Sequence, residues 1–163
     1  MATEKVTIRP ATAEDQAAIT DLIHRARLNP RDLDWRRFVV AVADDHVVGV
    51  AQLRTHRQGT RELASVAVES SLRGSGVGSG LVETFITGAE GTLYLMTRRE
   101  TEGYFARFGF ETVEAASTPA DFRRQFRIGQ IATAIFSIPA RRRLRIVAMR
   151  REAGQAAAEL DAR

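Results

Sequence analysis

The chain has 163 residues, of which 44% are hydrophobic and 27% charged, enough for one ordinary globular domain with its own core. It contains no cysteine, so disulfides, thiolate chemistry and cysteine-based zinc sites are excluded. The sequence has no apolar signal region at its start and no stretch of about 18 apolar residues. We therefore expect a soluble, cytoplasmic protein.

The net charge of +4 is unevenly distributed along the chain. Residues 121–151 contain nine arginines and a single acidic residue, Asp121, so this stretch carries +8 and the rest of the chain −4. Clustered charge of one sign is typical of a contact surface, but it also occurs on a solvated helix face. The sequence leaves both interpretations open.

The first third of the chain predicts a strand, a helix and a hairpin. Thr12, followed by Asp15 and an apolar helical repeat, is typical of a capped helix start, and an Asn-Pro pair ends that helix. Two β-branched runs around an Asp-Asp-His turn predict the hairpin. The expected ranges are a strand over 5–9, a helix over 12–26, a helical turn over 32–37, and strands over 38–42 and 47–53.

The remaining elements alternate between strands and helices, with glycines at the helix ends. The expected ranges are a strand over 63–68, a helix over 77–87, a strand over 93–97, a helix over 101–108, and strands over 110–113 and 144–149. Between the last two strands, residues 115–143 predict an arginine-rich helical insertion, in which Gly129 separates a first helix from a second over 130–137. We expect one domain over 1–153 and a frayed tail over 154–163.

The most informative segment is a glycine-rich loop between an apolar strand and a helix, residues 63–88. The first four backbone N–H groups of a helix have no intrahelical acceptor, and the helix dipole adds partial positive charge there. Glycines allow positive φ angles and remove the Cβ atoms that would keep a diphosphate away from these donors. The segment therefore predicts an anion site.

Two common diphosphate motifs do not fit this loop. The dinucleotide fingerprint needs Gly or Ala five residues after its first glycine, where this chain has Ser79 or Leu81. A Walker loop needs lysine, and the only lysine is Lys5. Neither a dinucleotide nor a Walker-type nucleotide site is expected.

The pattern Arg73-x-x-Gly76-x-Gly78, directly after a Val-Ala-Val strand, resembles the pyrophosphate loop of the GNAT superfamily of N-acetyltransferases. Residues 103–110 resemble the aromatic helix before the family's Gly-Phe turn, and the element order is similar over 5–114 and 144–150. The resemblance implies an α/β fold with a mixed, mostly antiparallel central sheet and helices on both faces. It also implies acetyl-CoA as co-substrate.

The resemblance assigns residues to the binding of acetyl-CoA. Backbone groups of the strand before the loop would hold the acyl carbonyl, the loop would hold the diphosphate, and polar residues after the next strand, including Arg98, would lie along the pantetheine arm. The implied residues are Val66, Ala67, Val68, Arg73, Gly74, Ser75, Gly76, Val77, Gly78, Ser79, Thr97 and Phe105.

Acetyl transfer to an amine needs a proton acceptor for the amine and a proton for the departing thiolate. By resemblance, Glu62 at the start of the strand is the candidate base, with His56 on the preceding loop as the competing one. The family's usual tyrosine acid falls at Phe105, so either the neighbouring Tyr104 is the acid or no tyrosine is used and the thiolate leaves by itself or through water. Each has an ordinary structural interpretation: a solvated or ion-paired strand-end Glu, an exposed loop His or an aromatic helix face.

The expected acceptor is a small-molecule primary amine such as an amino acid. Two alternatives are acetylation of protein N-termini or lysines and, since Phe105 replaces tyrosine, a non-catalytic acyl-CoA sensor. We expect no metal. A homodimer or a membrane contact through residues 122–143 stays open, and nucleic acid is disfavoured because no recognised binding motif accompanies the basic run.

Overall fold

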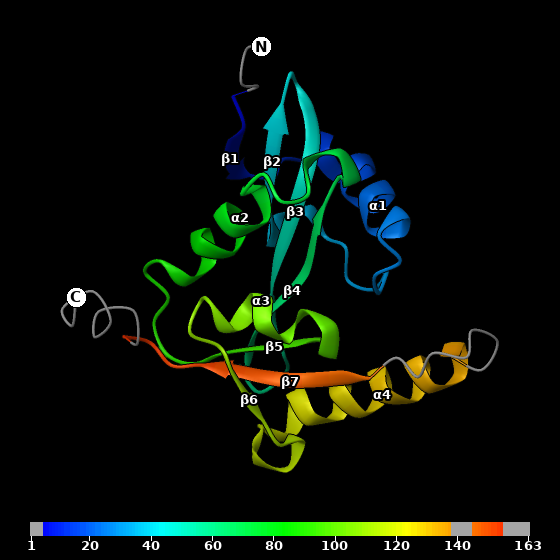
Figure 1. Cartoon of the computed structure of the whole chain (residues 1–163), viewed down its shortest axis with the longest axis vertical. Helices are drawn as coiled ribbons and strands as arrows, with labels where there is room; N and C mark the ends of the chain where they lie inside the picture. Colours follow the sequence, from blue (N-terminus) through cyan, green and yellow to red (C-terminus); the bar gives the residue numbers. More distant parts are fainter. Residues whose placement is uncertain (1–4, 138–144, 155–163) are drawn as a thin grey trace. The chain divides into compact units, whose positions relative to one another are not determined.

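The computed structural model of the chain describes residues 5–137 and 145–154 (Figure 1). Arg141, Arg142, Arg143 and the tail from residue 155 lie outside the described residues. The chain divides into two compact units, Met1–Arg54 with Leu63–Gly88, and Thr55–Glu62 with Ala89–Arg163.

The described strands form a mixed seven-stranded sheet in the hydrogen-bonded order β1-β2-β3-β4-β5-β7-β6. The pairs β1–β2, β2–β3, β5–β7 and β6–β7 are antiparallel, whereas β4–β5 is parallel. This confirms the predicted fold class. The strands are β1 (Thr7–Pro10), β2 (Phe38–Ala43), β3 (His46–Thr55), β4 (Arg61–Val68), β5 (Leu93–Arg98), β6 (Glu111–Val113) and β7 (Ile146–Arg151).

The α-helices of the described residues are α1 (Gln16–Arg25), α2 (Val77–Ile86), α3 (Glu102–Ala106) and α4 (Ala120–Ser137). Short 3-10 turns precede or connect them: η1 (Ala13–Asp15), η2 (Trp35–Arg37), η3 (Ser70–Leu72), η4 (Arg99–Thr101) and η5 (Ala115–Ser117). Within this part of the chain, none of the helices has the length and apolarity that a bilayer span requires.

In the first unit, α1 and α2 cover opposite faces of the strands. Successive residues of a strand point to opposite faces, so Val50 and Gly49 of β3 face different helices. Val50 shares a core cluster with buried residues of α1, whereas a Cβ on Gly49 would lie 3.0 Å from the Leu81 side chain of α2. The glycine therefore allows α2 to pack closely. The α1 cluster includes Ile19, Leu22, Ile23, Phe38, Val40 and Val50.

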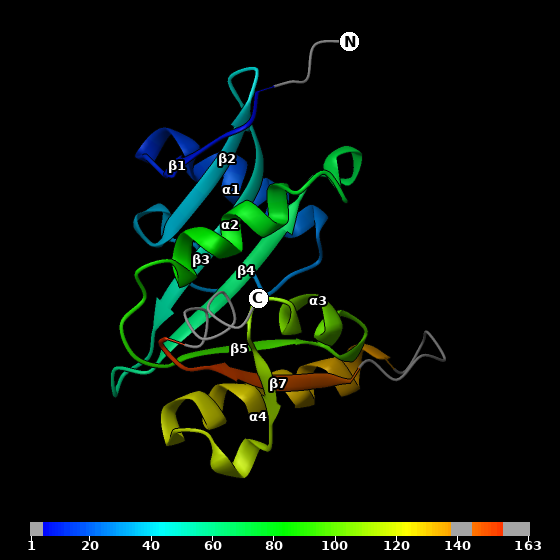
Figure 2. The same cartoon turned by 60° about the vertical axis from the view of Figure 1, so that its left-hand side comes forward.

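In the second unit, α3 and α4 lie on opposite sides of β5 and β7 (Figure 2). Phe122 and Phe126 of α4 are buried against Tyr94 of β5 and Ala148 of β7. The alternate residues Leu95 and Met149, which face one another in the β5–β7 register, are also buried and point to the other face. Helices thus cover both faces of these strands as predicted.

One sequence prediction is wrong: Gly129 does not interrupt the insertion. The structure has a single 18-residue helix, α4, through that position. A glycine inside a helix costs only about 1 kcal/mol relative to alanine, which packing can offset. Here a Cβ on Gly129 would lie 3.2 Å from Cδ1 of Ile146, so the glycine lets the helix lie close to β7.

Candidate functional site

The loop between β4 and α2 leaves backbone donors at the start of a helix. Gly76 is the N-cap residue of α2, with φ +92°, and no side chain caps the helix. The first N–H that bonds back to this cap belongs to Gly80, whose donor lies 3.0 Å from the Gly76 carbonyl. By helix geometry, the N–H groups of residues 76–79 precede it and have no intrahelical acceptor.

The glycines of this loop allow its positive φ angles and leave open space beside the backbone. Gly74 and Gly76 both have positive φ, at +80° and +92°, and an added Cβ at either would meet nothing within 4 Å. Arg73 is exposed in the same loop. It lies between Leu72 and Ser75, and the hydroxyl of Ser75 donates to the Leu72 carbonyl at 2.6 Å. Exposed donors, a helix dipole and a guanidinium fit a diphosphate.

The strand before the loop has an irregular residue that sequence reasoning missed. Ser65 of β4 has φ +54°, a left-handed conformation that is rare outside glycine, and it lies directly before Val66. Its hydroxyl donates to Oε1 of Gln52 at 3.1 Å, and Gln52 is fully buried. The sequence signal that could have indicated this contact is Gln52, a polar residue within the apolar run of β3. Such strain within a strand is typical of functional positions.

The structure brings the two candidate bases, Glu62 and His56, together in the second unit. His56 Nε2 lies 2.7 Å from Glu62 Oε2, and both side chains are about 95% buried, with 6% and 5% exposed. The two were alternatives in the sequence. His56 is not an exposed loop histidine and Glu62 is not solvated, whereas the other ordinary interpretation of Glu62, a paired side chain, agrees with this contact. The two side chains are therefore at hydrogen-bond distance from each other.

The environment of this pair is aromatic. The imidazole of His56 meets Phe122 edge-on, with ring centroids 5.9 Å apart, and the other neighbour of Phe122 is Tyr94 at 5.2 Å. Tyr94 is paired with Glu62 in the parallel register of β4 and β5. Aromatic rings around the pair lower the local dielectric and strengthen its hydrogen bond.

Tyr104, the candidate acid, has its ring fixed by neighbours from its own helix and turn. It is half-buried, perpendicular to Phe105 at 5.1 Å and tilted against Phe108 at 5.4 Å. The guanidinium of Arg107 lies 4.8 Å from its ring centroid, at cation–π distance. Phe105 itself is buried. These contacts orient the ring, and its role as an acid stays a prediction.

Thr97, one residue before the end of β5, has its hydroxyl 2.6 Å from the hydroxyl of Thr101. Arg98, the last residue of the strand, is exposed. His24 is exposed on α1, so it has the surface position that the sequence suggested. Among the described residues, no group of three or more His, Cys, Asp or Glu side chains could hold a metal ion.

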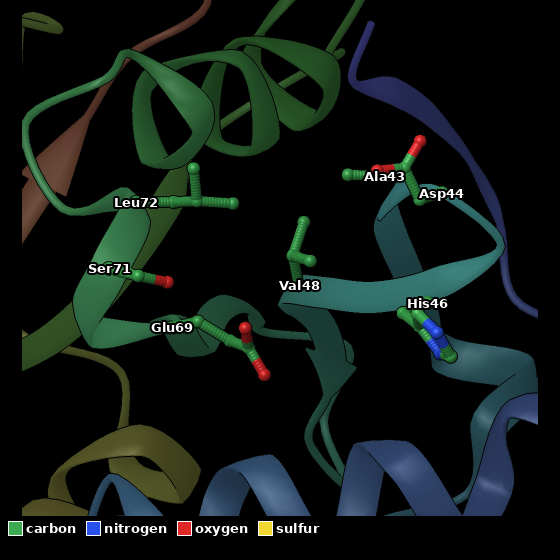
Figure 3. A pocket seen from close by; sticks show the side chains of 7 residues that line it. All are labelled: Ala43, Asp44, His46, Val48, Glu69, Ser71 and Leu72. Carbon is green, nitrogen blue, oxygen red and sulfur yellow. The ribbon is translucent and has the colours of Figure 1, made fainter. Parts of the chain in front are cut away.

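A pocket of about 610 Å³ lies in the first unit, beside the start of β3 and the end of β4 (Figure 3). Ser71 and Leu72 line it from one side, and residues of the β2–β3 hairpin line it from the other. Two carboxylates, Asp44 and Glu69, are among its lining residues and would repel phosphate groups. It is therefore not the predicted diphosphate site. The lining residues are Ala43, Asp44, His46, Val48, Glu69, Ser71 and Leu72.

Residues 34–112 match the family model described as an acetyltransferase (GNAT) domain. No curated protein sequence matches the chain significantly. The matched range contains the glycine loop, the His56–Glu62 pair and α3, and it ends before α4.

Several solved structures share the fold. An N-acetylglutamate synthase from Neisseria gonorrhoeae, complexed with coenzyme A and N-acetyl-glutamate, is similar with a TM-score of 0.74 and 21% identity. The similarity covers 93% of this chain and 36% of that protein, so the chain spans about a third of its length.

Two further structures match over nearly their whole length. Rv2747 from Mycobacterium tuberculosis, in complex with CoA, has a TM-score of 0.68 and 24% identity over 90% of this chain and 98% of that one. The ribosomal-protein-S18-alanine N-acetyltransferase from Escherichia coli has a TM-score of 0.65 and 17% identity over 91% and 94%. These similarities show a shared fold.

Proposed function

Because residues 34–112 match the model of a GNAT acetyltransferase domain, we propose that the chain transfers the acetyl group of acetyl-CoA directly to the primary amine of a small molecule such as an amino acid. One observation carries the proposal. The glycine loop of the matched domain ends in a helix start with no side-chain cap, where four backbone donors can meet a diphosphate.

In this proposal, backbone N–H groups supply most of the hydrogen bonds to the co-substrate. The N–H groups of residues 76–79 and the guanidinium of Arg73 hold the diphosphate, and a backbone N–H of Val66, Ala67 or Val68 donates to the acyl carbonyl. Thr97 and Phe105 line the pantetheine arm. When bound, acetyl-CoA supplies an acetyl group activated as a thioester.

Proton transfer is the task of side chains. The attacking amine must lose a proton, and the His56–Glu62 pair accepts it, directly or through a water molecule. Because both side chains are buried, bulk water competes little for that proton. Tyr104 donates a proton to the departing sulfur.

A small acceptor is favoured by the likeness to a synthase whose structure holds N-acetyl-glutamate. Arginines near the acceptor would favour a substrate with a carboxylate. The second candidate is acetylation of a protein N-terminus, supported by the likeness to the S18-alanine enzyme over 94% of that protein.

The test is CoA thiol release by the purified full chain with acetyl-CoA and two panels, free amino acids and short peptides with varied N-termini. We expect turnover with one or a few amino acids, and an acetylated product 42 Da (about one acetyl group) heavier by mass spectrometry. Turnover with peptides alone would show that the acceptor is a protein and not a small molecule. Binding of acetyl-CoA by calorimetry without turnover in either panel would make the chain a sensor.

A further inference from the structure

The first turn of α4 is tied to the turn that carries His56. The carboxylate of Asp121 accepts a hydrogen bond from the Gln58 N–H at 2.9 Å and another from the Thr60 hydroxyl at 2.6 Å. These donors are 63 and 61 residues away in the sequence. Asp121 also accepts from the N–H of Phe122 at 2.9 Å. One carboxylate therefore joins the helix start to the β3–β4 turn.

The carboxylate of Asp121 is charged at neutral pH. Burial acts to raise its pKa, but hydrogen bonds from Thr60, Gln58 and Phe122 outweigh burial and hold the pKa below its usual range. Hydrogen bonds to an ionised acceptor are about twice as strong as neutral ones. The tie to the turn is therefore a strong one.

The next residue, Phe122, contacts the imidazole itself. It is fully buried, and its ring stands at 80° to the ring of His56. Two consecutive residues of α4 thus fix the same element in two ways, since Asp121 holds the turn backbone and Phe122 the imidazole plane. Two backbone hydrogen bonds close the turn itself, from the N–H of His56 to the Thr60 carbonyl at 2.8 Å and from the N–H of Gly59 to the His56 carbonyl at 3.0 Å. Asp121 and Phe122 add the contacts that join this closed turn to α4.

We propose that Asp121 is a positioning residue for proton transfer, holding the 56–60 turn so that the imidazole of His56 stays on Glu62. The family match ends at residue 112, before α4 begins, so Asp121 lies outside the part of the chain that the family model matches. The inference rests on the proposed role of the His56–Glu62 pair. It gives the start of the arginine-rich insertion a function.

The test uses Asp121→Ala and Asp121→Asn in the full chain, with Asp21→Asn as control. Asp21 is an exposed aspartate on α1, 2.8 Å from Arg25. A displacement of about 1 Å at a reacting group can cost up to about 100-fold in rate. We expect kcat to fall about 10- to 100-fold in Asp121→Ala and less in Asp121→Asn, which keeps one acceptor oxygen. Acetyl-CoA affinity should stay within about twofold, and the control should match wild type.

A double-mutant cycle separates positioning from general destabilisation. In a His56→Gln background, the loss caused by Asp121→Ala should largely disappear, because both act through one group. If the two losses multiply, or if Asp121→Ala keeps full kcat, the proposal is wrong. If Asp121→Ala does not fold, Thr60→Val is the substitute variant, because it removes a single donor to the carboxylate. We expect it to lower kcat a few-fold, and this loss should likewise be absent in the His56→Gln background.

A spectroscopic readout keeps this inference distinct from the proposed function. Long-range ¹H–¹⁵N spectra of the imidazoles, with the His56 signal assigned through His56→Gln, should show one fixed tautomer in wild type and an averaged signal in Asp121→Ala. If wild type shows no turnover but the signal changes, positioning holds and the catalytic assignment fails. An unchanged signal overturns positioning whatever the activity.

Discussion

The glycine loop and the His56–Glu62 pair are two kinds of site in one chain. The loop is made of backbone donors and of glycines whose Cβ positions face open space. The pair is made of two side chains that are almost fully buried and 2.7 Å apart. A backbone site should tolerate side-chain changes but not a change of φ, whereas a side-chain site should depend on single atoms. Substitutions can test that difference directly.

The largest expected effect is that of Glu62→Gln. The change keeps the shape but removes the charge that accepts a proton, so kcat/KM at neutral pH should fall about 10²- to 10⁴-fold. Acetyl-CoA affinity should not change. Thiol release and calorimetry measure the two quantities, and His24→Gln, at an exposed histidine of α1, is the control. Full activity in Glu62→Gln would show that the His56–Glu62 pair does not accept the proton.

A carboxylate with an equally short contact offers a contrast. Asp15 is buried in the first unit, 2.7 Å from Nη1 of Arg9, and it also accepts the N–H of Thr12 at 2.7 Å. Asp15→Asn should lower the free energy of unfolding by about 2 kcal/mol, since hydrogen bonds to charged groups contribute about 1.5–3 kcal/mol. Activity of the folded fraction should be unchanged. A large loss of kcat with normal stability would contradict the division between structural and catalytic carboxylates.

The same carboxylate predicts a pH dependence of stability. The hydrogen bond from Arg9 is the main cause that lowers the pKa of Asp15, while burial opposes it. A pKa that is lower in the folded state stabilises the fold above the unfolded pKa, and this contribution disappears as the pH falls through the folded pKa. Urea unfolding between pH 7 and pH 2 should show acid destabilisation that is smaller in Asp15→Asn. Equal acid sensitivity in both proteins would contradict this assignment.

A smaller effect is expected for Gly76→Ala, and it tests the backbone site. Alanine at positive φ costs about 1–2 kcal/mol, so the helix start should shift and weaken CoA binding about tenfold. Gly88→Ala is a matched control because Gly88 also has positive φ, +76°, and open space at its Cβ. Both should lose similar stability, but only Gly76→Ala should lose affinity in calorimetry. Equal affinities would argue against the loop as the diphosphate site.

The smallest effect is expected for Val66→Ala. If the strand before the loop holds the acyl carbonyl through its backbone N–H, removing two methyl groups should change kcat by less than about threefold. The half-buried position should cost about 1 kcal/mol of stability. Steady-state rates and thermal unfolding measure both. A loss of tenfold or more in kcat would show that the side chain itself takes part.

The sequence predicted what depends on neighbours along the chain. The glycine loop with α2, the β2–β3 hairpin and the capped turn η1 that leads into α1 follow from local patterns. These patterns are positive-φ glycines, β-branched runs and a capping box at Thr12. The predicted interruption at Gly129 is wrong, because the helix continues through this glycine, at a position where an added Cβ would lie 3.2 Å from Ile146 of β7. The family match confirmed the resemblance that the loop motif had indicated.

The catalytic candidates show what sequence could not decide. The sequence named Glu62 and His56 as alternative bases. Only the tertiary structure shows that they are in contact, because a turn at the end of β3 brings the imidazole back to the start of β4. The sequence singled out Asp121 only as the one acidic residue of a basic stretch, and nothing local indicates donors 61 and 63 residues away. Helix caps and glycine turns are set by a few adjacent dihedral angles. Buried polar contacts between distant residues are set by the packing of the whole chain, and that information is absent from any local pattern.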